Sequence, residues 1–180
     1  MNLGYTSFMR VLGIDCGSEY TGYGVVEEMP AHRLFCCAVG AIKLRPRDHI
    51  AVKLQHIYSQ LSHVIAEHRP EMVAIEDVFY ALNVKSALKL GQVRGVAMLA
   101  ASASGLEVAE YSPLSIKSAV VGYGRAEKRQ VQDMVMRLLN LPELPEPSDA
   151  ADALAIAICH IHTASTLGRF KKAKSQEAIS

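Results

Sequence analysis

Residues 10–28 read RVLGIDCGSEYTGYGVVEE, and this stretch predicts the start of a β-sheet. RVLGID is a short apolar strand that ends in Asp15, CGSEYTG is a turn, and GYGVVEE alternates well enough to form the second strand of a hairpin. LFCCAVGAIK, residues 34–43, predicts a third strand. Such a meander grows from one side of its first strand. We therefore expect the first strand to be central, with later strands added on its other side.

The rest of the chain alternates helices with strands. Apolar residues recur with a period of about 3.6 from Ile50 to Ile65, which predicts a helix that Pro70 stops. Further strands are predicted at 71–76 and 106–111, and further helices at about 83–103, 112–122, 126–140 and from Ser148 onward. This order is typical of an α/β fold, in which a mixed five-stranded sheet carries helices on both faces.

Length and composition favour a single globular domain. The chain has 180 residues, of which 50% are hydrophobic and 21% are charged, so it can bury a full core and is not disordered. The four cysteines form no CxxC pair, and we interpret them as the reduced thiols of a cytoplasmic protein. We find no secretory signal and no uninterrupted apolar run of about 18 residues, so no membrane partner is expected.

The net charge of +1 does not by itself indicate a nucleic-acid partner, but the charge is unevenly distributed. Residues 165–180 carry four basic side chains against Glu177. We expect this segment to be a basic, flexible tail, as chain ends commonly are. Residues 1–9 are expected to be an N-terminal extension, because Met9 lies directly before the first strand, and residues 10–164 to be the folded domain.

Four acids lie at the ends of predicted elements. Asp15 and Glu76 close two strands, and Asp149 and Asp152 lie three residues apart on the first turn of the last helix, so they face one way. Sites in α/β folds gather at the carboxyl ends of strands. Carboxylates brought together repel one another unless cations separate them, and Mg²⁺ or Mn²⁺ takes oxygen ligands. Two such ions about 3.5–4 Å apart would activate water at a phosphodiester.

Ordinary structural roles remain open for these acids. Asp149 or Asp152 could cap the last helix or complement its dipole, and Asp15 could be a turn residue before Gly17. Glu76 is harder to explain in this way, since a carboxylate that closes a buried strand needs a partner.

Five stretches carry a more specific signal when taken together: GIDCGSEYTGYGVVE, AIEDVF, SALKLGQVRGVA, VVGYGRAEKRQV and SDAADALAIAI. They resemble the RuvC family of crossover (Holliday) junction endodeoxyribonucleases from about Val11 to His162. The resemblance implies an RNase H-like nuclease domain that forms a homodimer, resolves four-way DNA junctions by paired, symmetric cuts during recombination and repair, and works with the RuvAB branch-migration complex.

The resemblance also implies roles for individual residues. Two Mg²⁺ ions per subunit, or Mn²⁺ in their place, would be held by the four acids: Asp15, Glu76, Asp149 and Asp152. Lys117 and Lys128 match basic residues near the scissile phosphate, and Phe79 matches an aromatic residue that meets bases at the junction centre. Tyr80 follows Phe79 and could stack on an unpaired base.

The helix predicted at 83–103 carries a set of basic residues and a pair of glycines, and each has two possible explanations. Lys85, Lys89 and Arg94 could contact backbone phosphates, or they could form an ordinary solvated face. Gly91 and Gly95 have a GxxxG spacing, which indicates local packing or the close approach of a second helix across a dimer.

Three other functions share part of this pattern. GIDCGSEYTGYG is similar to the phosphate-gripping hairpin of actin-like ATPases and sugar kinases, although those enzymes need two lobes and roughly twice this length. A different RNase H-like nuclease, acting on RNA–DNA hybrids, would use the same acids. A junction-binding module without catalysis would have lost them.

Overall fold

The central sheet has the first strand in its middle. The structure is a computed structural model that describes residues 9–77 and 84–177, with side chains as far as residue 167. The strands are β1 (Arg10–Cys16), β2 (Tyr20–Met29), β3 (Arg33–Lys43), β4 (Met72–Glu76) and β5 (Glu107–Tyr111). Their order in the sheet is β3-β2-β1-β4-β5, with β1 antiparallel to β2 and parallel to β4. The predicted central position of the first strand is confirmed.

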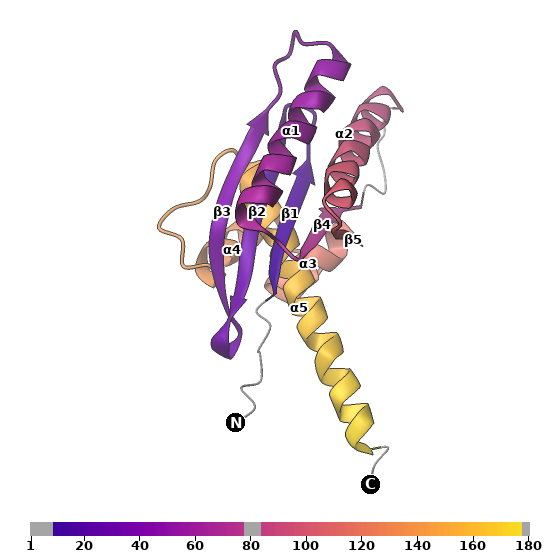
Figure 1. The fold of residues 1–180 in the computed structure, drawn as a ribbon. Coiled ribbons are helices and arrows are strands. Elements are labelled where there is room, and N and C mark those ends of the chain that lie inside the picture. Colours follow the sequence, from indigo (N-terminus) through magenta and orange to yellow (C-terminus); the bar gives the residue numbers. More distant parts are fainter. Residues whose placement is uncertain (1–8, 78–83, 178–180) are drawn as a thin grey trace.

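Helices cover both faces of the sheet (Figure 1). They are α1 (Ile50–His68), α2 (Val84–Ala103), α3 (Pro113–Val121), α4 (Lys128–Leu138) and α5 (Ser148–Glu177), and a short 3₁₀ turn (Pro30–His32) joins β2 to β3. The helices α1 and α2 pack on one face, whereas α3, α4 and α5 pack on the other. This arrangement confirms the predicted mixed sheet between two helical layers.

The boundaries of the helices follow from local chemistry. The Ser112 side chain accepts a hydrogen bond from the Ser115 backbone N–H at 3.1 Å and so begins α3, which ends at Gly122 with φ +95°. Glu127 and Gln130 form a reciprocal capping box that begins α4. The first of the predicted helices ends slightly before Pro70, because Arg69 adopts the left-handed conformation after His68.

The last helix is longer than the predicted core segment. The sequence favours a flexible tail over residues 165–180, but α5 continues through this segment as far as Glu177 and extends beyond the sheet (Figure 1). The physical reason is composition, since Leu, Arg, Lys, Ala, Gln and Glu are among the strongest helix formers.

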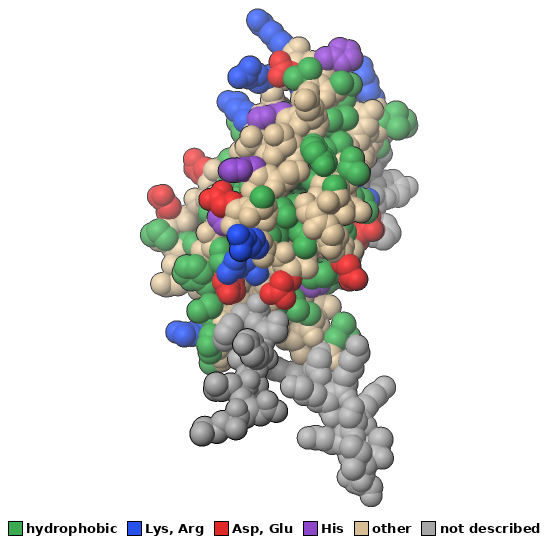
Figure 2. Space-filling model, viewed as in Figure 1, with side chains coloured by type: hydrophobic (Ala, Val, Ile, Leu, Met, Phe, Trp, Pro, Cys, Tyr) green, Lys and Arg blue, Asp and Glu red, His purple; other side chains and the backbone are tan. Residues whose placement is uncertain are grey.

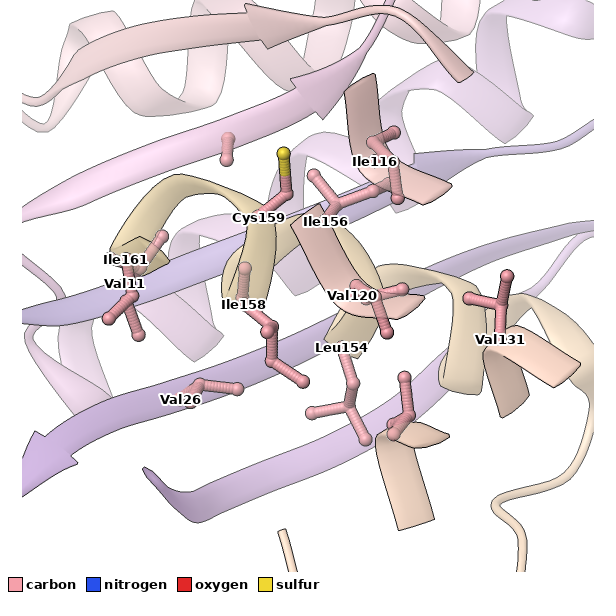
Figure 3. Packing of buried hydrophobic residues seen from close by; sticks show 14 of the residues in the cluster. Val11, Val26, Ile116, Val120, Val131, Leu154, Ile156, Ile158, Cys159 and Ile161 are labelled. Carbon is pink, nitrogen blue, oxygen red and sulfur yellow. The ribbon is translucent and has the colours of Figure 1, made fainter. Parts of the chain in front are cut away.

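Alternation along β1 divides the core into two clusters. Leu12 and Ile14 point toward α1 and α2, whereas Val11 points toward α5. On the α5 side, Val11 and Val26 belong to one cluster with the apolar α5 residues Leu154, Ile156, Ile158 and Ile161 (Figure 3). Because alternate residues of a strand point to the same face of the sheet, residues 13 and 15 share the α5 side with Val11. Asp15 therefore lies beneath α5.

Glycines let α5 lie directly on the strands. A Cβ atom at Gly13 would stand 2.0 Å from the Ala153 carbonyl oxygen, and one at Gly22 would stand 2.0 Å from the Asp149 carbonyl oxygen. No side chain fits in either place, so the helix backbone and the strand backbone are in contact there. This close approach fixes the height of the first turn of α5 above the sheet.

In the part of the chain that the structure describes, one helix is long and apolar enough to cross a membrane by length and composition alone, over Ser148–Leu167. Most of this stretch is buried against the sheet and against α3 and α4. Its apolar character is therefore that of a core helix. Asp149 and Asp152 interrupt it, which is why the sequence contains no continuous apolar run.

Candidate active site

Two of the four acids are neighbours because their strands are parallel. Ile14 on β1 pairs with Ile75 on β4, so the following residues, Asp15 and Glu76, lie side by side where both strands end. Val11 and Ala74 belong to the α5-side cluster, and a period of two therefore places Asp15 and Glu76 on that side as well. Both carboxylates are half-buried. The predicted adjacency of these two acids is confirmed.

The other two acids come from the first turn of α5. The contact at Gly22 holds the backbone of Asp149 against β2. A Cβ atom at Gly17 would lie 3.0 Å from the Asp149 Oδ1 atom, so this carboxylate stands over the turn between β1 and β2. Asp152 lines one pocket together with Glu76. The chain thus brings acids from β1, β4 and α5 to one edge of the sheet.

The carboxylates perturb one another strongly. Burial, followed by the charges of Asp152, Glu76 and Asp149, raises the pKa of Asp15 from 3.8 to about 7, and Lys128 opposes this shift. Burial and the charge of Asp152 also raise the pKa of Glu76. A group of acids held at such a cost in electrostatic energy is typical of a functional site, where a cation or a proton completes the charge balance.

Lys128 is the cation closest to this group of acids. Its ammonium group lies 2.6 Å from the Asp152 Oδ2 atom and donates a hydrogen bond to the Ser148 Oγ atom at 3.2 Å. The hydrogen bond to Asp152 raises the pKa of Lys128, so the lysine stays charged. Burial raises the pKa of Asp152, while the Lys128 hydrogen bond and charge lower it. The capping box of α4 places Lys128 at this point.

A pocket of about 220 Å³ opens beside the acids. Glu76 and Asp152 line it together with Lys117 from α3 and Lys128 from α4, and the remaining wall is largely apolar. Lys117 lowers the pKa of Glu76 through its charge, which places the two side chains in electrostatic contact. The structure therefore brings together all six residues that the sequence predicts for catalysis.

The donor set fits a hard divalent cation by its chemistry. Four carboxylates supply only oxygen ligands, which Mg²⁺ and Mn²⁺ prefer, and the described lining of the adjoining pocket includes no histidine or cysteine. Over residues 9–77 and 84–177, however, no three His, Cys, Asp or Glu side chains stand close enough together to hold an ion as they are placed. Asp152 is paired with Lys128 instead.

Comparison with known proteins gives the same assignment. Residues 11–160 match the family model described as crossover junction endodeoxyribonuclease RuvC. The chain belongs to this family. The RuvC protein of Koribacter versatilis is 66% identical over 89% of this chain and 97% of its own length. That of Acidobacterium capsulatum is 56% identical, over 88% of this chain and 96% of its own length.

Solved RuvC structures have the same fold. The Thermus thermophilus RuvC structure superposes with a TM-score of 0.80 at 36% identity, over 88% of this chain and 96% of that chain. The same protein in complex with a Holliday junction substrate gives a TM-score of 0.83, over 87% of this chain and 94% of that chain. The fold of this RuvC-family chain is thus RNase H-like, and the chain is an endodeoxyribonuclease rather than an actin-like ATPase.

The outer residues predicted to bind DNA have different environments. Lys85 and Lys89 are exposed on α2. Arg94 is not exposed in this way, because its guanidinium group forms an ion pair with Glu110 on β5 and lies 3.6 Å from the Asp77 carboxylate. Phe79 and Tyr80 lie outside the described residues.

Two features of the site have no counterpart in the sequence prediction. The ion pair between Lys128 and Asp152 joins residues 24 positions apart, and nothing in either segment indicates it. The glycine contacts beneath α5 could have been found from the sequence. Gly22 and Gly24 stand two residues apart on the second strand, Gly13 lies on the first strand, and the last helix is rich in alanine.

Proposed function

We propose that this RuvC-family endonuclease resolves four-way DNA junctions by metal-dependent hydrolysis at the cluster formed by Asp15, Glu76, Asp149 and Asp152. The observation that carries the proposal is the convergence of these carboxylates, which raises the pKa of Asp15 to about 7 at an open edge of the sheet. A related protein from Thermus thermophilus has been captured with a Holliday junction substrate, which supports the choice of DNA.

The acids would hold Mg²⁺, two ions per subunit, with Mn²⁺ as a substitute. Bound there, the ions would supply a water of lowered pKa and would neutralise charge on the phosphodiester. Asp15 lies on the central strand, and the charges of Glu76, Asp149 and Asp152 all act on it, which supports a role for it in holding both ions. Lys117 and Lys128 line the adjoining pocket, where their charges would stabilise the negative charge that develops on the phosphate.

A homodimer would supply the symmetry that paired cutting requires. One face of α2 carries an exposed stripe formed by Val84, Leu88, Gly91, Gly95 and Leu99, whose three large side chains are 75%, 65% and 57% exposed. These positions fall opposite the buried Val93 and Ala97 at 100° per residue. The two glycines would let a second α2 approach closely, and a two-fold dimer would present two sites to a nearly two-fold junction.

The cellular setting follows from the same assignment. An enzyme that resolves junctions in bacterial recombination acts in the cytoplasm and needs no membrane. All four cysteines of the chain are free, as reduced thiols would be there. Cooperation with the RuvAB branch-migration complex is part of the proposal on the strength of family membership alone.

Nicking of a synthetic immobile junction tests this proposal. The wild-type chain should cut the junction in Mg²⁺ and not in EDTA, and it should leave a plain duplex and an RNA–DNA hybrid intact. Asp15→Asn should bind the junction with unchanged affinity while its nicking rate falls by about 10³-fold or more, as for catalytic groups that act as a unit.

Asp77→Asn is the matched control for that experiment. Asp77 lies directly after Glu76 at the same end of β4, but Arg94 is its partner and it stands outside the acid cluster. We expect its nicking rate to stay within a few-fold of the wild type. If Asp15→Asn cuts as fast as the control, or if the hybrid is the better substrate, the proposed chemistry is wrong.

A further inference from the structure

A second cleft opens at the same edge of the sheet as the acids, on the side of α1 and α2. It has a volume of about 630 Å³ and is formed by the β1–β2 turn, the loop between β3 and α1, and α2. The side chains that determine its charge are Arg47, His49, Lys53, Lys89, Glu19 and Asp48. Because β3 is parallel to β1, the loop that follows β3 starts at the edge where Asp15 lies.

Two cations of this cleft, Arg47 and Lys53, come from one short segment. That segment, residues 43–56, contains four Lys or Arg residues and a single acid, and its other two cations line a neighbouring pocket. Figure 2 shows Lys and Arg side chains gathered at the end of the molecule where the loop between β3 and α1 lies. The surface of an otherwise nearly neutral chain is therefore rich in cations around this loop.

The cations of this cleft are not neutralised within the chain. Elsewhere Arg10, Arg94 and Lys128 each have a carboxylate within ion-pair distance. In the part of the chain that the structure describes, no carboxylate lies within 4.0 Å of the charged groups of Arg47 or Lys89. Positive groups left without internal partners around a concave surface favour an anionic ligand.

The cleft is built on a fixed frame. The Leu44 backbone N–H donates a hydrogen bond to the Glu19 carbonyl oxygen at 2.8 Å, which ties the loop between β3 and α1 to the β1–β2 turn. The Lys53 ammonium group donates to the Pro46 carbonyl oxygen at 3.2 Å, which holds the loop against the first turn of α1. These two hydrogen bonds tie the loop to the β1–β2 turn and to α1.

The cleft is close to the acids. Ser18 lines it and follows Asp15 by three residues, so their Cα atoms are at most about 11 Å apart. Duplex DNA carries one negative charge per roughly 1.7 Å of its axis. A strand with a phosphate at Asp15 would therefore place further phosphates within reach of the cleft.

We propose that this cleft, here called the basic cleft, binds the phosphate backbone of a duplex arm of the junction, next to the strand that is cut. Arg47, Lys53 and Lys89 contact the phosphates, and Glu19 and Asp48 limit the contact to a few of them. The inference rests on the proposed function, since the ligand is the same junction. It adds a second anchoring point that orients the arm relative to the acids.

The test compares two double variants of equal charge. Arg47→Gln with Lys53→Gln removes two cations of the basic cleft, whereas Arg33→Gln with Arg137→Gln removes two exposed cations that lie outside it. Binding to an immobile junction is measured in EDTA from 50 to 300 mM salt. We expect the first variant to bind about tenfold more weakly at 100 mM salt. We also expect the negative slope of the logarithm of its association constant against the logarithm of salt concentration to be less steep by about 2.

The control variant should keep both the wild-type slope and the wild-type nicking rate in Mg²⁺, because Arg33 and Arg137 lie outside the basic cleft. Equal slopes for the two double variants would overturn the inference while wild-type nicking still stands. Failure of the wild type to nick the junction would instead overturn the proposed function. If the double variant does not fold, Arg47→Gln alone decides, with an expected loss of about 1 in the slope.

Junctions with progressively shortened arms identify the DNA segment that the cleft binds. The difference in affinity between the wild type and the cleft variant should disappear once the arms are too short to reach the cleft. A difference that persists on the shortest arms would contradict the assignment to a duplex arm.

Discussion

At the scale of single residues, Asp15 shows what the fold costs in electrostatic energy. It is half-buried, three other carboxylates face it, and its pKa is raised from 3.8 to about 7. Between these two values the unfolded chain releases the proton of Asp15 while the folded chain keeps it. The stability of the fold therefore decreases as the pH rises from about 4 to about 7, and the full penalty remains above that range.

Asp15→Asn should remove this dependence when no divalent cation is present. The variant has no proton to release at this position, so we expect it to be more stable than the wild type at pH 8 by an amount on the order of 1–4 kcal/mol. The gain should shrink steadily as the pH is lowered toward 4. Urea unfolding in EDTA at pH 4.5, 6 and 8 measures this, and a gain that stays constant with pH would contradict it.

The positions of the acids could be predicted at this scale, but the pairing of the cations could not. Asp15 and Glu76 follow from strand ends and from a period of two, both of which are properties of a short stretch. The partners of Arg94 and Lys128 lie 16 and 24 residues away on other elements. The sequence therefore leaves open whether Arg94 contacts DNA or lies on a solvated face, and the structure places its guanidinium group in an ion pair with Glu110.

At the scale of elements, the contact between α5 and the two central strands determines the geometry of the site. The backbone of α5 lies on Gly13 and Gly22 with no side chain between them. Asp149 and Asp152 are on the first turn of this same helix, so their distance from Asp15 depends on how closely the helix approaches.

Gly13→Ala tests this dependence. The added methyl group would stand 2.0 Å from the Ala153 carbonyl oxygen and 2.7 Å from the Ala157 nitrogen, both backbone atoms that cannot turn aside. We expect α5 to move outward, the free energy of unfolding to fall by about 2 kcal/mol or more, and nicking per folded molecule to fall at least about tenfold. Thermal unfolding and single-turnover nicking give the two values.

Val11→Ala is the control for this variant. Val11 is fully buried on the same side of the same strand, but shortening it removes atoms instead of adding them. It should cost a similar free energy of unfolding and leave the nicking rate of the folded molecules within a few-fold of the wild type. Equal losses of activity in both variants would show that general destabilisation, and not helix displacement, is responsible.

The order of elements could be predicted from the sequence because each strand and helix has a clear period and clear end signals. The height of α5 above the sheet could not, because it is a tertiary contact between backbones. From the sequence, the glycines of β1 and β2 are assigned to a strand, a turn and a hairpin. Only the pairing of the two strands shows that these glycines share the sheet face that α5 covers.

At the scale of the whole molecule, the exposed stripe on α2 makes the oligomeric state testable. Leu88 is 65% exposed and lies in the stripe between Val84 and Gly91. We expect Leu88→Glu to dissociate the proposed dimer at micromolar concentration, because two buried like charges would face each other across the axis. Sedimentation velocity measures the dissociation directly.

The same variant should uncouple the two cuts. On a plasmid with an extruded cruciform, the wild type should produce linear DNA, whereas the variant should accumulate nicked circles. Leu167→Glu, at an exposed leucine of α5 outside the stripe, is the control and should behave as the wild type does. A Leu88→Glu protein that remains dimeric and still linearises the plasmid would exclude this face as the interface.

The sequence indicates the symmetry of the molecule only through its resemblance to a family. The GxxxG spacing of Gly91 and Gly95 is compatible with local packing, and it acquires meaning as a surface only when the opposite face of α2 is known to be buried. The sequence prediction includes Lys89 as a possible phosphate contact but not the basic cleft as a whole, because its cations come together from a loop and from two helices, α1 and α2.

The position of α5 also bears on how safely this enzyme can exist among chromosomal DNA. The helix that supplies Asp149 and Asp152 also packs its apolar residues on the sheet, so a copy in which this helix has left the sheet would have these two acids separated from Asp15 and Glu76. We expect such a misfolded copy to leave the DNA around it uncut.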